Sequence, residues 1–306
     1  MVTVEDNVAA ISHDARLARR FERWDDTGDE YRAVAARIAA FQALAELVGV
    51  LPFMEWLPRV PDYVRKQMFL AKIQDEVGHG HVMVRVAEDL GISRERILED
   101  FVAGRTKLLN VFHYGFESWE EIGPATLLMN SAAIIQFQSL HHGTYLPYAR
   151  ALKKIEREEG FHYHHALDFT HEILTVGGER GRRIVDGVFR TWFSRMLAYF
   201  GPPDTATVQA SAAYQFGLKV DSNDVLRQRW LSKIVPVFIG LGVEIPSDLV
   251  WYNTETDVWE YAPVDFDAVR HLVSNGGPRY HDWLAAIRDS LERNRPYRLA
   301  ALGLAS

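Results

Sequence analysis

Two segments of the chain place a glutamate three residues before a histidine: Glu76 with His79, and Glu159 with His162. In an α-helix this spacing puts a carboxylate and an imidazole one turn apart on the same face. Apolar residues recur every three or four positions around both pairs, and an acidic residue directly precedes each glutamate. Both pairs are therefore expected to face a core, where an uncompensated charge is costly. A pair of metal ions could compensate both, as in helical bundles that bind two metals.

The plainer interpretation is two core histidines held by salt bridges. In a chain with 12 histidines and 41 acidic residues, chance alone supplies roughly one Glu-x-x-His, and a second copy is no surprise. Two copies that each follow an acid, and each lie in the middle of an apolar helical stripe, are harder to obtain by accident. The sequence therefore favours a metal centre over two buried ion pairs.

Four long helices are predicted to hold these residues. Apolar spacing predicts helices over residues 30–50, 61–90, 124–145 and 147–176, and four such helices in succession are typical of a bundle. Glu46 lies beside the apolar stripe of the first helix. A lone glutamate there is more often a solvated edge residue, but the two Glu-x-x-His helices need a further carboxylate donor.

A dimetal centre in a bundle takes one carboxylate from each of two helices and a Glu-x-x-His pair from each of the other two. We assign Glu46, Glu76 and His79 to one ion, and Glu159 and His162 to the other. Glu76 and Glu159 are the predicted bridges, because carboxylate oxygens neutralise divalent ions that imidazoles hold in position. The three glutamates are the predicted catalytic residues.

Three charged residues beside these ligands are predicted to support them. Asp75 and Glu158 are expected to accept the free ring N–H of the histidine on the opposite helix, which would fix the tautomer of each imidazole. Either acid alone could equally be an ordinary charged residue at a helix edge. Lys72 lies one turn before Glu76 and is expected to neutralise one of these two acids, with a solvated lysine as the alternative.

The third predicted helix supplies no acidic ligand, because no Asp or Glu occurs between Gly123 and Arg150. Its inward face carries three polar side chains, Asn130, Gln138 and His141. Asn130 is the candidate metal ligand of this helix, although a neutral amide is a weaker donor than a carboxylate. Gln138 and His141 are candidates for the lining of a substrate cavity.

A smaller C-terminal region follows the bundle. Residues 180–200 and 224–240 have amphipathic helical spacing, and residues 251–253 and 258–261 are predicted to form a β-hairpin. Two further helices are predicted to close the chain. No flexible linker separates the two regions, so we expect them to pack as one unit.

The composition excludes several classes of partner. The net charge is −7 and no basic block occurs that could track phosphates, which argues against nucleic acid. Cysteine is absent, so disulfides and thiolate chemistry are excluded. Residues 1–10 do not resemble a secretory signal, and apolar runs such as residues 235–243 are shorter than the ~20 residues that span a bilayer. A cytoplasmic protein with no membrane partner is expected.

With these residues in place, the chain resembles the family of catalytic subunits of phenylacetyl-CoA epoxidase (phenylacetate-CoA oxygenase). The members of this family are ferritin-like bacterial diiron oxygenases. The resemblance extends over nearly the whole length. The segments that carry it are AELVG at 45–49, LAKIQDEVGHG at 70–80, PYARA at 147–151, EEGFH at 158–162, FGP at 200–202 and NDVLRQR at 223–229.

This resemblance implies an all-α, ferritin-like four-helix bundle with additional C-terminal helices and a small β-hairpin. A single domain would cover residues 1–306, with a bundle core at about 28–200 and a C-terminal extension at about 201–306. The implied activity is that of a non-haem diiron oxygenase, which activates O₂ and oxidises an aromatic or acyl substrate; in the family this substrate is a CoA thioester.

The resemblance also implies cofactors and partners. The cofactors would be two iron ions, or a mixed iron and manganese pair, together with O₂. Electrons would come from a separate reductase. The other partners would be a homologous non-catalytic subunit or further copies of this chain.

The chain departs from the family's pattern at three places. The family has an aspartate ligand where this chain has Asn130, and a glutamate, a partner for Lys72, where this chain has Phe53. Gly217 and Lys219 stand where the family has two lysines, and Lys219 is retained as a candidate substrate-binding residue. These differences imply a divergent member with fewer negative charges around the second ion and a substrate other than phenylacetyl-CoA.

A catalytically silent structural subunit, like the family's metal-free partner subunit, is the alternative function. The complete sets of glutamate and histidine donors argue against it, while Asn130 argues for it. Iron storage of the ferritin kind is a weaker third interpretation. The chain is far longer than a simple bundle needs, and its aromatic residues indicate a substrate cavity.

Overall fold

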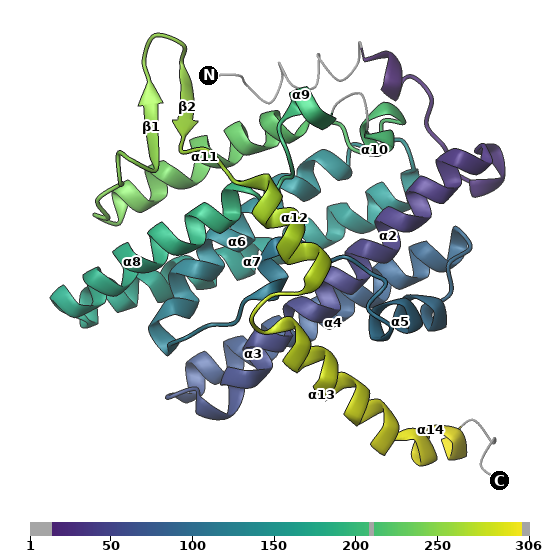
Figure 1. Cartoon of the computed structure of the whole chain (residues 1–306), viewed down its shortest axis with the longest axis horizontal. Helices are drawn as coiled ribbons and strands as arrows, with labels where there is room; N and C mark the ends of the chain where they lie inside the picture. The colour runs from purple at the N-terminus through teal and green to yellow at the C-terminus, as the bar shows by residue number, and fades with distance from the viewer. Residues whose placement is uncertain (1–13, 208–210, 302–306) are drawn as a thin grey trace.

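Four long helices form the centre of the computed structural model, which describes residues 14–207 and 211–301. They are α2 (Asp29–Gly49), α4 (Tyr63–Asp89), α6 (Trp119–Leu140) and α7 (Leu146–Val176). Helix α2 packs along α4, α6 packs along α7, and α4 faces α7 (Figure 1). The predicted all-α class and the ferritin-like bundle are confirmed. Residues 1–10, which were predicted not to form a secretory signal, lie outside the described residues.

A close approach of α4 to α2 brings the first carboxylate donor toward the Glu-x-x-His helix. Gly80 of α4 lies against α2, where an added Cβ would be 2.7 Å from Leu47 Cγ and 3.1 Å from the Ala43 carbonyl oxygen. A side chain at this position would force Leu47 and the α2 backbone to shift, so glycine permits the close approach of the two helices. Glu46, next to Leu47, is therefore held close to α4.

Side-chain caps explain where two of the bundle helices begin. Asp62 accepts a hydrogen bond from the Arg65 N–H (2.8 Å) at the start of α4, and Ser118 accepts one from the Glu121 N–H (3.2 Å) at the start of α6. The prediction that α6 begins at Pro124 was wrong, because the cap lies before Trp119 and the proline is tolerated inside the helix.

The end of α6 also differs from the prediction. The helix ends at Leu140 rather than near Tyr145. Gly143 donates to the Leu140 carbonyl oxygen in a turn (2.9 Å), and Thr144 then donates to the carbonyl oxygen of Gly217 (3.0 Å). A contact with a segment far along the sequence therefore ends the helix.

A second layer covers α6 and α7. Helix α8 (Gly178–Leu197) packs on both, and α11 (Asn223–Gly240) packs on α6. Trp192 and Trp230 from this layer are fully buried, and the Trp230 indole N–H donates to the hydroxyl of Ser131 on α6 (2.9 Å). The predicted hairpin is present as β1 (Val250–Asn253) antiparallel to β2 (Val258–Tyr261), with Val250 opposite Tyr261.

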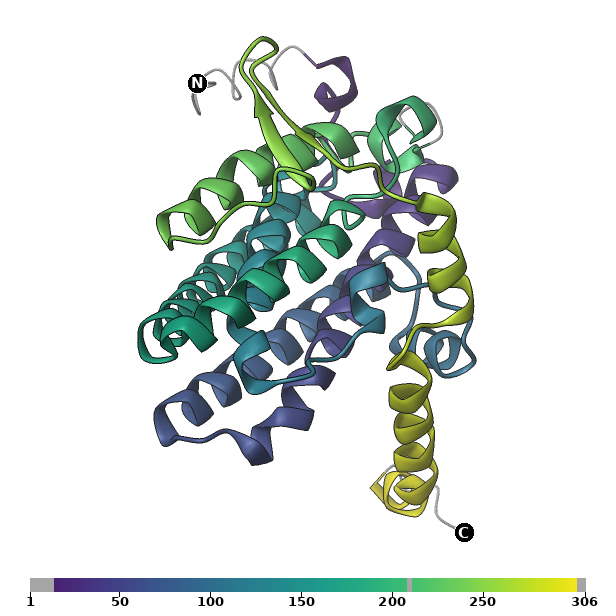
Figure 2. The same ribbon diagram turned by 60° about the vertical axis from the view of Figure 1, so that its left-hand side comes forward.

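Shorter elements connect and extend these layers. Two single helical turns, η1 (Ala15–Leu17) and η2 (Trp24–Asp26), precede α2. The others are α3 (Leu51–Trp56), η3 (Leu57–Arg59), α5 (Arg94–Val102), η4 (Asn110–His113), α9 (Asp204–Thr207), α10 (Ala212–Gln215), α12 (Phe266–Asn275), α13 (Tyr280–Arg293) and α14 (Arg295–Ala301). In the described chain, three helices rather than the predicted two follow the hairpin, because a break at Asn294 divides the last one. Helices α13 and α14 project from the body of the protein (Figure 2).

One helical stretch of the described chain, Asp29–Arg59, is long and apolar enough to span a membrane by length and composition alone. Of its most apolar window, 56% is buried inside the protein. The stretch contains α2, which packs along α4 in the bundle. Burial against other helices therefore accounts for its apolar character.

Candidate metal centre

Five of the predicted ligands meet in the middle of the bundle. Glu46 comes from α2, Glu76 and His79 from α4, and Glu159 and His162 from α7, and none exposes more than 9% of its surface. Four of them, all except His162, offer donor atoms that lie within 4.8 Å of one another. This group is the set assigned to the first ion, with Glu159 added as a bridge.

His162 shares its neighbours with that group. Its Nδ1 lies 3.5 Å from Glu76 Oε1 and 3.3 Å from Glu159 Oε1. On the other side, His79 Nδ1 lies 3.8 Å from Glu76 Oε2 and 3.4 Å from Glu159 Oε1. Glu76 and Glu159 thus lie between the two imidazoles, where carboxylates that bridge two ions would have to be.

Hydrogen bonds across the bundle hold both imidazoles. His79 Nε2 on α4 lies 3.0 Å from Glu158 Oε2 on α7, and His162 Nε2 on α7 lies 3.3 Å from Asp75 Oδ2 on α4. Each acid therefore contacts the histidine of the opposite helix. An Nε2–H that donates to a carboxylate leaves Nδ1 free to bind a metal ion and raises its basicity.

The donor set fits a divalent transition metal. The Nδ1 atoms of His79 and His162 are buried and have no hydrogen-bond partner in the described part of the chain, although carboxylate oxygens surround both. Burial lowers the pKa of His79, but the carboxylates of Glu159, Glu46 and Glu76 outweigh it and raise the pKa to about 12. For Glu46 the effect of burial has the opposite sign, because burial disfavours the charged carboxylate and raises its pKa. Without a metal, protons must supply the positive charge that the carboxylates need.

Lys72 lies inside this centre, which differs from the prediction. Its side chain is 6% exposed, and its ammonium pairs with Glu76 rather than with Asp75 or Glu158. Burial lowers the pKa of Lys72, but the charges of Glu76, Glu159 and Glu46 outweigh it and raise the pKa. The physical reason is packing between the helices. Asp75 contacts His162 and Glu158 contacts His79, so Glu76, one turn after Lys72, is the acid that remains for the ammonium.

Asn130 of α6 also reaches the centre. Its Oδ1 lies 3.5 Å from Lys72 Nζ, and its Nδ2 is buried without a hydrogen-bond partner among residues 14–207 and 211–301. The third helix therefore presents its amide to the same space as the glutamates, next to the lysine ammonium.

A cavity of about 80 Å³ adjoins the three glutamates. Its wall is mainly apolar, and its other lining residues include Phe53, Leu109, Phe112, Met129, Phe137 and Tyr199. Two polar neighbours here were not predicted from the sequence. Gln42 donates to Glu46 Oε1 (2.5 Å), as its position one turn before Glu46 could have indicated. Tyr199 follows α8, and only the tertiary fold brings it to the cavity.

The three predicted substrate-binding residues lie elsewhere. Gln138 donates to Glu156 Oε1 (3.0 Å), and the imidazole of His141 faces the same carboxylate. Lys219 donates to the Asn223 side chain, and burial lowers its pKa to about 8. None of the three lines the cavity beside the glutamates. Gln138 and His141 are turned toward α7 and α11, and Lys219 lies in the segment between α10 and α11.

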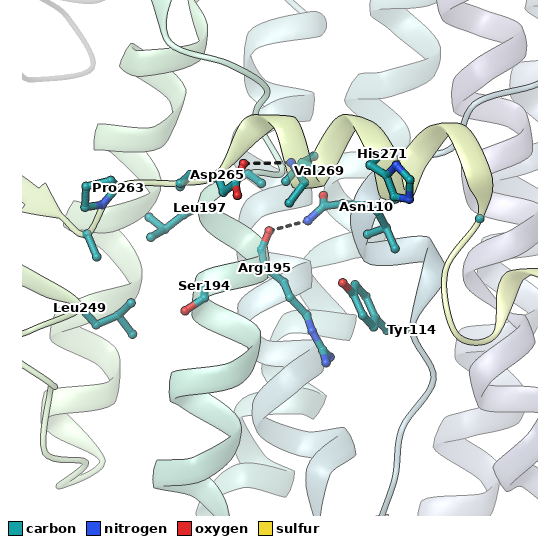
Figure 3. Close-up of a pocket in the computed structure, with 16 residues that line it drawn as sticks. Asn110, Tyr114, Ser194, Arg195, Leu197, Leu249, Pro263, Asp265, Val269 and His271 are labelled. Atoms are coloured by element: carbon teal, nitrogen blue, oxygen red, sulfur yellow. Dashed lines mark hydrogen bonds between the residues drawn. The ribbon is translucent and has the colours of Figure 1, made fainter.

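A larger cavity, of about 560 Å³, lies apart from the metal centre between α8 and α12 (Figure 3). Its polar residues already have structural partners. Asn110 donates to the Arg195 carbonyl oxygen (2.8 Å), and Asp265 caps α12 by accepting from the Asp267 N–H (3.0 Å). No cluster of metal donors or nucleophiles faces this cavity among the residues that line it.

Metal binding at this centre is expected to strengthen as the pH rises. The ion must replace the proton that His79 carries in the metal-free site, so binding releases at least one proton and the apparent affinity should rise about tenfold per pH unit between about pH 6 and 8. Anaerobic Fe(II) titrations at both ends of that range, in two buffers of different ionisation enthalpy, would measure affinity and proton release together. An affinity that does not change with pH would contradict the proposed ligation.

A helical bundle with three buried glutamates and two Glu-x-x-His histidines is typical of the carboxylate-rich bundles that bind metal ions in their core. Residues 11–278 match the family described as phenylacetic acid catabolic protein, so the chain belongs to that family and the resemblance seen in the sequence is confirmed. One relative is a component of the 1,2-phenylacetyl-CoA epoxidase of Escherichia coli (strain K12). It is 32% identical over 274 residues, which cover 90% of this chain and 88% of the relative.

Proposed function

We propose that this chain is the oxygen-activating subunit of a multicomponent oxygenase of the phenylacetyl-CoA epoxidase type, with iron as its metal. The observation that supports this most is the group of carboxylate and imidazole donors of Glu46, Glu76, His79 and Glu159, all within 4.8 Å of one another. Mixed imidazole and carboxylate ligands suit iron, with manganese as the nearest alternative. The E. coli relative is itself one of the subunits of an epoxidase.

Glu46, Glu76, His79 and Glu159 would hold the iron, and His162 with Asn130 would serve a second ion if two are bound. Bound iron would supply the one-electron chemistry that O₂ requires. The residues around the iron would orient its ligands. Asp75 and Glu158 keep the imidazoles in the metal-binding tautomer, as their contacts with the opposite histidines support.

The apolar cavity beside the glutamates would receive the end of the substrate that reacts. Phe53, Phe112 and Phe137 would keep water away from it, since cavities with apolar walls exclude water. An aromatic or acyl group fits such a wall, and a CoA thioester is the form in which the relative's name places its substrate. The proposal also includes a separate reductase that supplies electrons and a homologous partner subunit. It places the protein in the cytoplasm.

Oxygen incorporation would test this function directly. The iron-loaded chain, in complex with its homologous partner subunit and supplied with O₂, an electron donor and a reductase, is expected to convert an aromatic or acyl CoA thioester into a product with one added oxygen atom. Labelled O₂ and mass spectrometry would identify that atom's origin. No incorporation from any such thioester, with iron bound and the reductase active, would contradict the proposal.

A catalytically silent subunit is the second candidate, and one contact favours it. The ammonium of Lys72 pairs with Glu76, which a bridging role would require to be free for metal. A chain of this kind would show no oxygen incorporation in the same assay.

A further inference from the structure

The Lys72 ammonium lies where a second metal ion would find its donors. It pairs with Glu76 Oε1, the same oxygen that lies 3.5 Å from His162 Nδ1. It is also 3.5 Å from Asn130 Oδ1, the oxygen that α6 offers to the centre. Two of the donors available to the second ion are therefore already in contact with a positive charge.

Lys72 has no other ion-pair partner among the residues that the structure describes. Its ammonium pairs with Glu76 and lies 5.2 Å from the centre of the Phe53 ring. An aromatic ring attracts a cation through its face but cannot replace a carboxylate, so the ring encloses the ammonium on that side. With 6% of Lys72 exposed, water does not offer it an alternative.

The charges of the buried centre balance with one metal ion. Glu46, Glu76 and Glu159 carry three negative charges, and one divalent ion together with the Lys72 ammonium carries three positive charges. Two divalent ions beside the ammonium would leave two positive charges uncompensated. Uncompensated charges in a buried site are strongly unfavourable.

We propose that the chain holds one divalent ion, at Glu46, Glu76, His79 and Glu159, and that the Lys72 ammonium is the second cation of the centre. This inference rests on the proposed function only in taking the cluster to be a metal site. A second ion then binds where Lys72 is absent or withdraws from Glu76. The number of ions per chain is thereby set by a lysine that the bundle encloses.

Anaerobic titration of Fe(II) into the metal-free chain, followed by elemental analysis, tests this. The wild-type chain is expected to retain about one ion, and the Lys72→Met/Asn130→Asp chain about two, because the double substitution restores charge balance with two ions. Lys72→Met alone should bind the second ion more weakly than the double variant. Lys153→Met, which removes an exposed lysine on α7, should match the wild type.

Each result either supports or overturns the inference. Two tightly held ions in the wild type would overturn it while leaving the proposed function intact, and a folded double variant that stays at one ion would overturn the role of Lys72. No metal in any variant would overturn the proposed function as well. The wild-type stoichiometry does not depend on how the variants fold, and circular dichroism would show which of them are folded.

Discussion

Replacing Glu159 with alanine is expected to remove the metal from the chain while leaving its helical content intact. Glu159 belongs to the group of donors for the first ion and lies between the two histidines. A unit charge about 4 Å from a cation contributes about 4 kcal/mol at an effective dielectric of about 20, so the affinity should fall by at least about 100-fold. Elemental analysis and circular dichroism of the purified variant would measure both outcomes.

The companion variant Glu76→Ala should lose metal too, but with an additional effect. Glu76 is also the ion-pair partner of the buried Lys72, so its removal leaves an unpaired buried charge, which costs about 3–5 kcal/mol of stability. Glu159→Ala is therefore the cleaner test of metal binding. The control is Glu88→Ala, which removes a surface carboxylate of α4 that pairs with Arg94. Retention of wild-type metal content in Glu159→Ala would rule out its role as a metal ligand.

Replacing Asn130 with aspartate is expected to raise the affinity for a second ion more than the affinity for the first. The substitution adds a negative charge where the amide oxygen now lies, 3.5 Å from Lys72 Nζ and beside Glu76. A charge at about that distance is worth several kcal/mol even at an effective dielectric of about 20. Lys72 offsets part of this gain, so the effect should be larger when Lys72 is also replaced.

Parallel Fe(II) titrations of the metal-free wild type and Asn130→Asp would measure this gain. The first binding step should change little, and a second, weaker step should appear or tighten in the variant. Asn275→Asp, which adds the same charge at the end of α12, serves as the control. If wild type and Asn130→Asp bind iron with the same stoichiometry and affinity, Asn130 takes no part in the centre.

The spacing of residues along the chain was sufficient to predict most of the donor cluster. Glu-x-x-His forces its two side chains onto one helical face whatever the helix packs against, so Glu76 with His79 and Glu159 with His162 follow from local geometry. The apolar stripes then direct those faces to the core, which is where all four residues lie. The same reasoning predicted the bundle and the hairpin.

The tertiary structure determined which side chains from other elements contact the donor cluster and the cavity. The rotation of α6 about its axis turns Gln138 and His141 toward Glu156 instead of the cavity, and sequence periodicity leaves that rotation open by tens of degrees. Tyr199 reaches the cavity only because α8 folds back over the bundle. The ion-pair partner of Lys72 depended on which acids remained within reach once α4, α6 and α7 were packed. In the packed bundle that acid is Glu76. Local geometry thus determined which residues share a face, while contacts between helices determined which charges share a site.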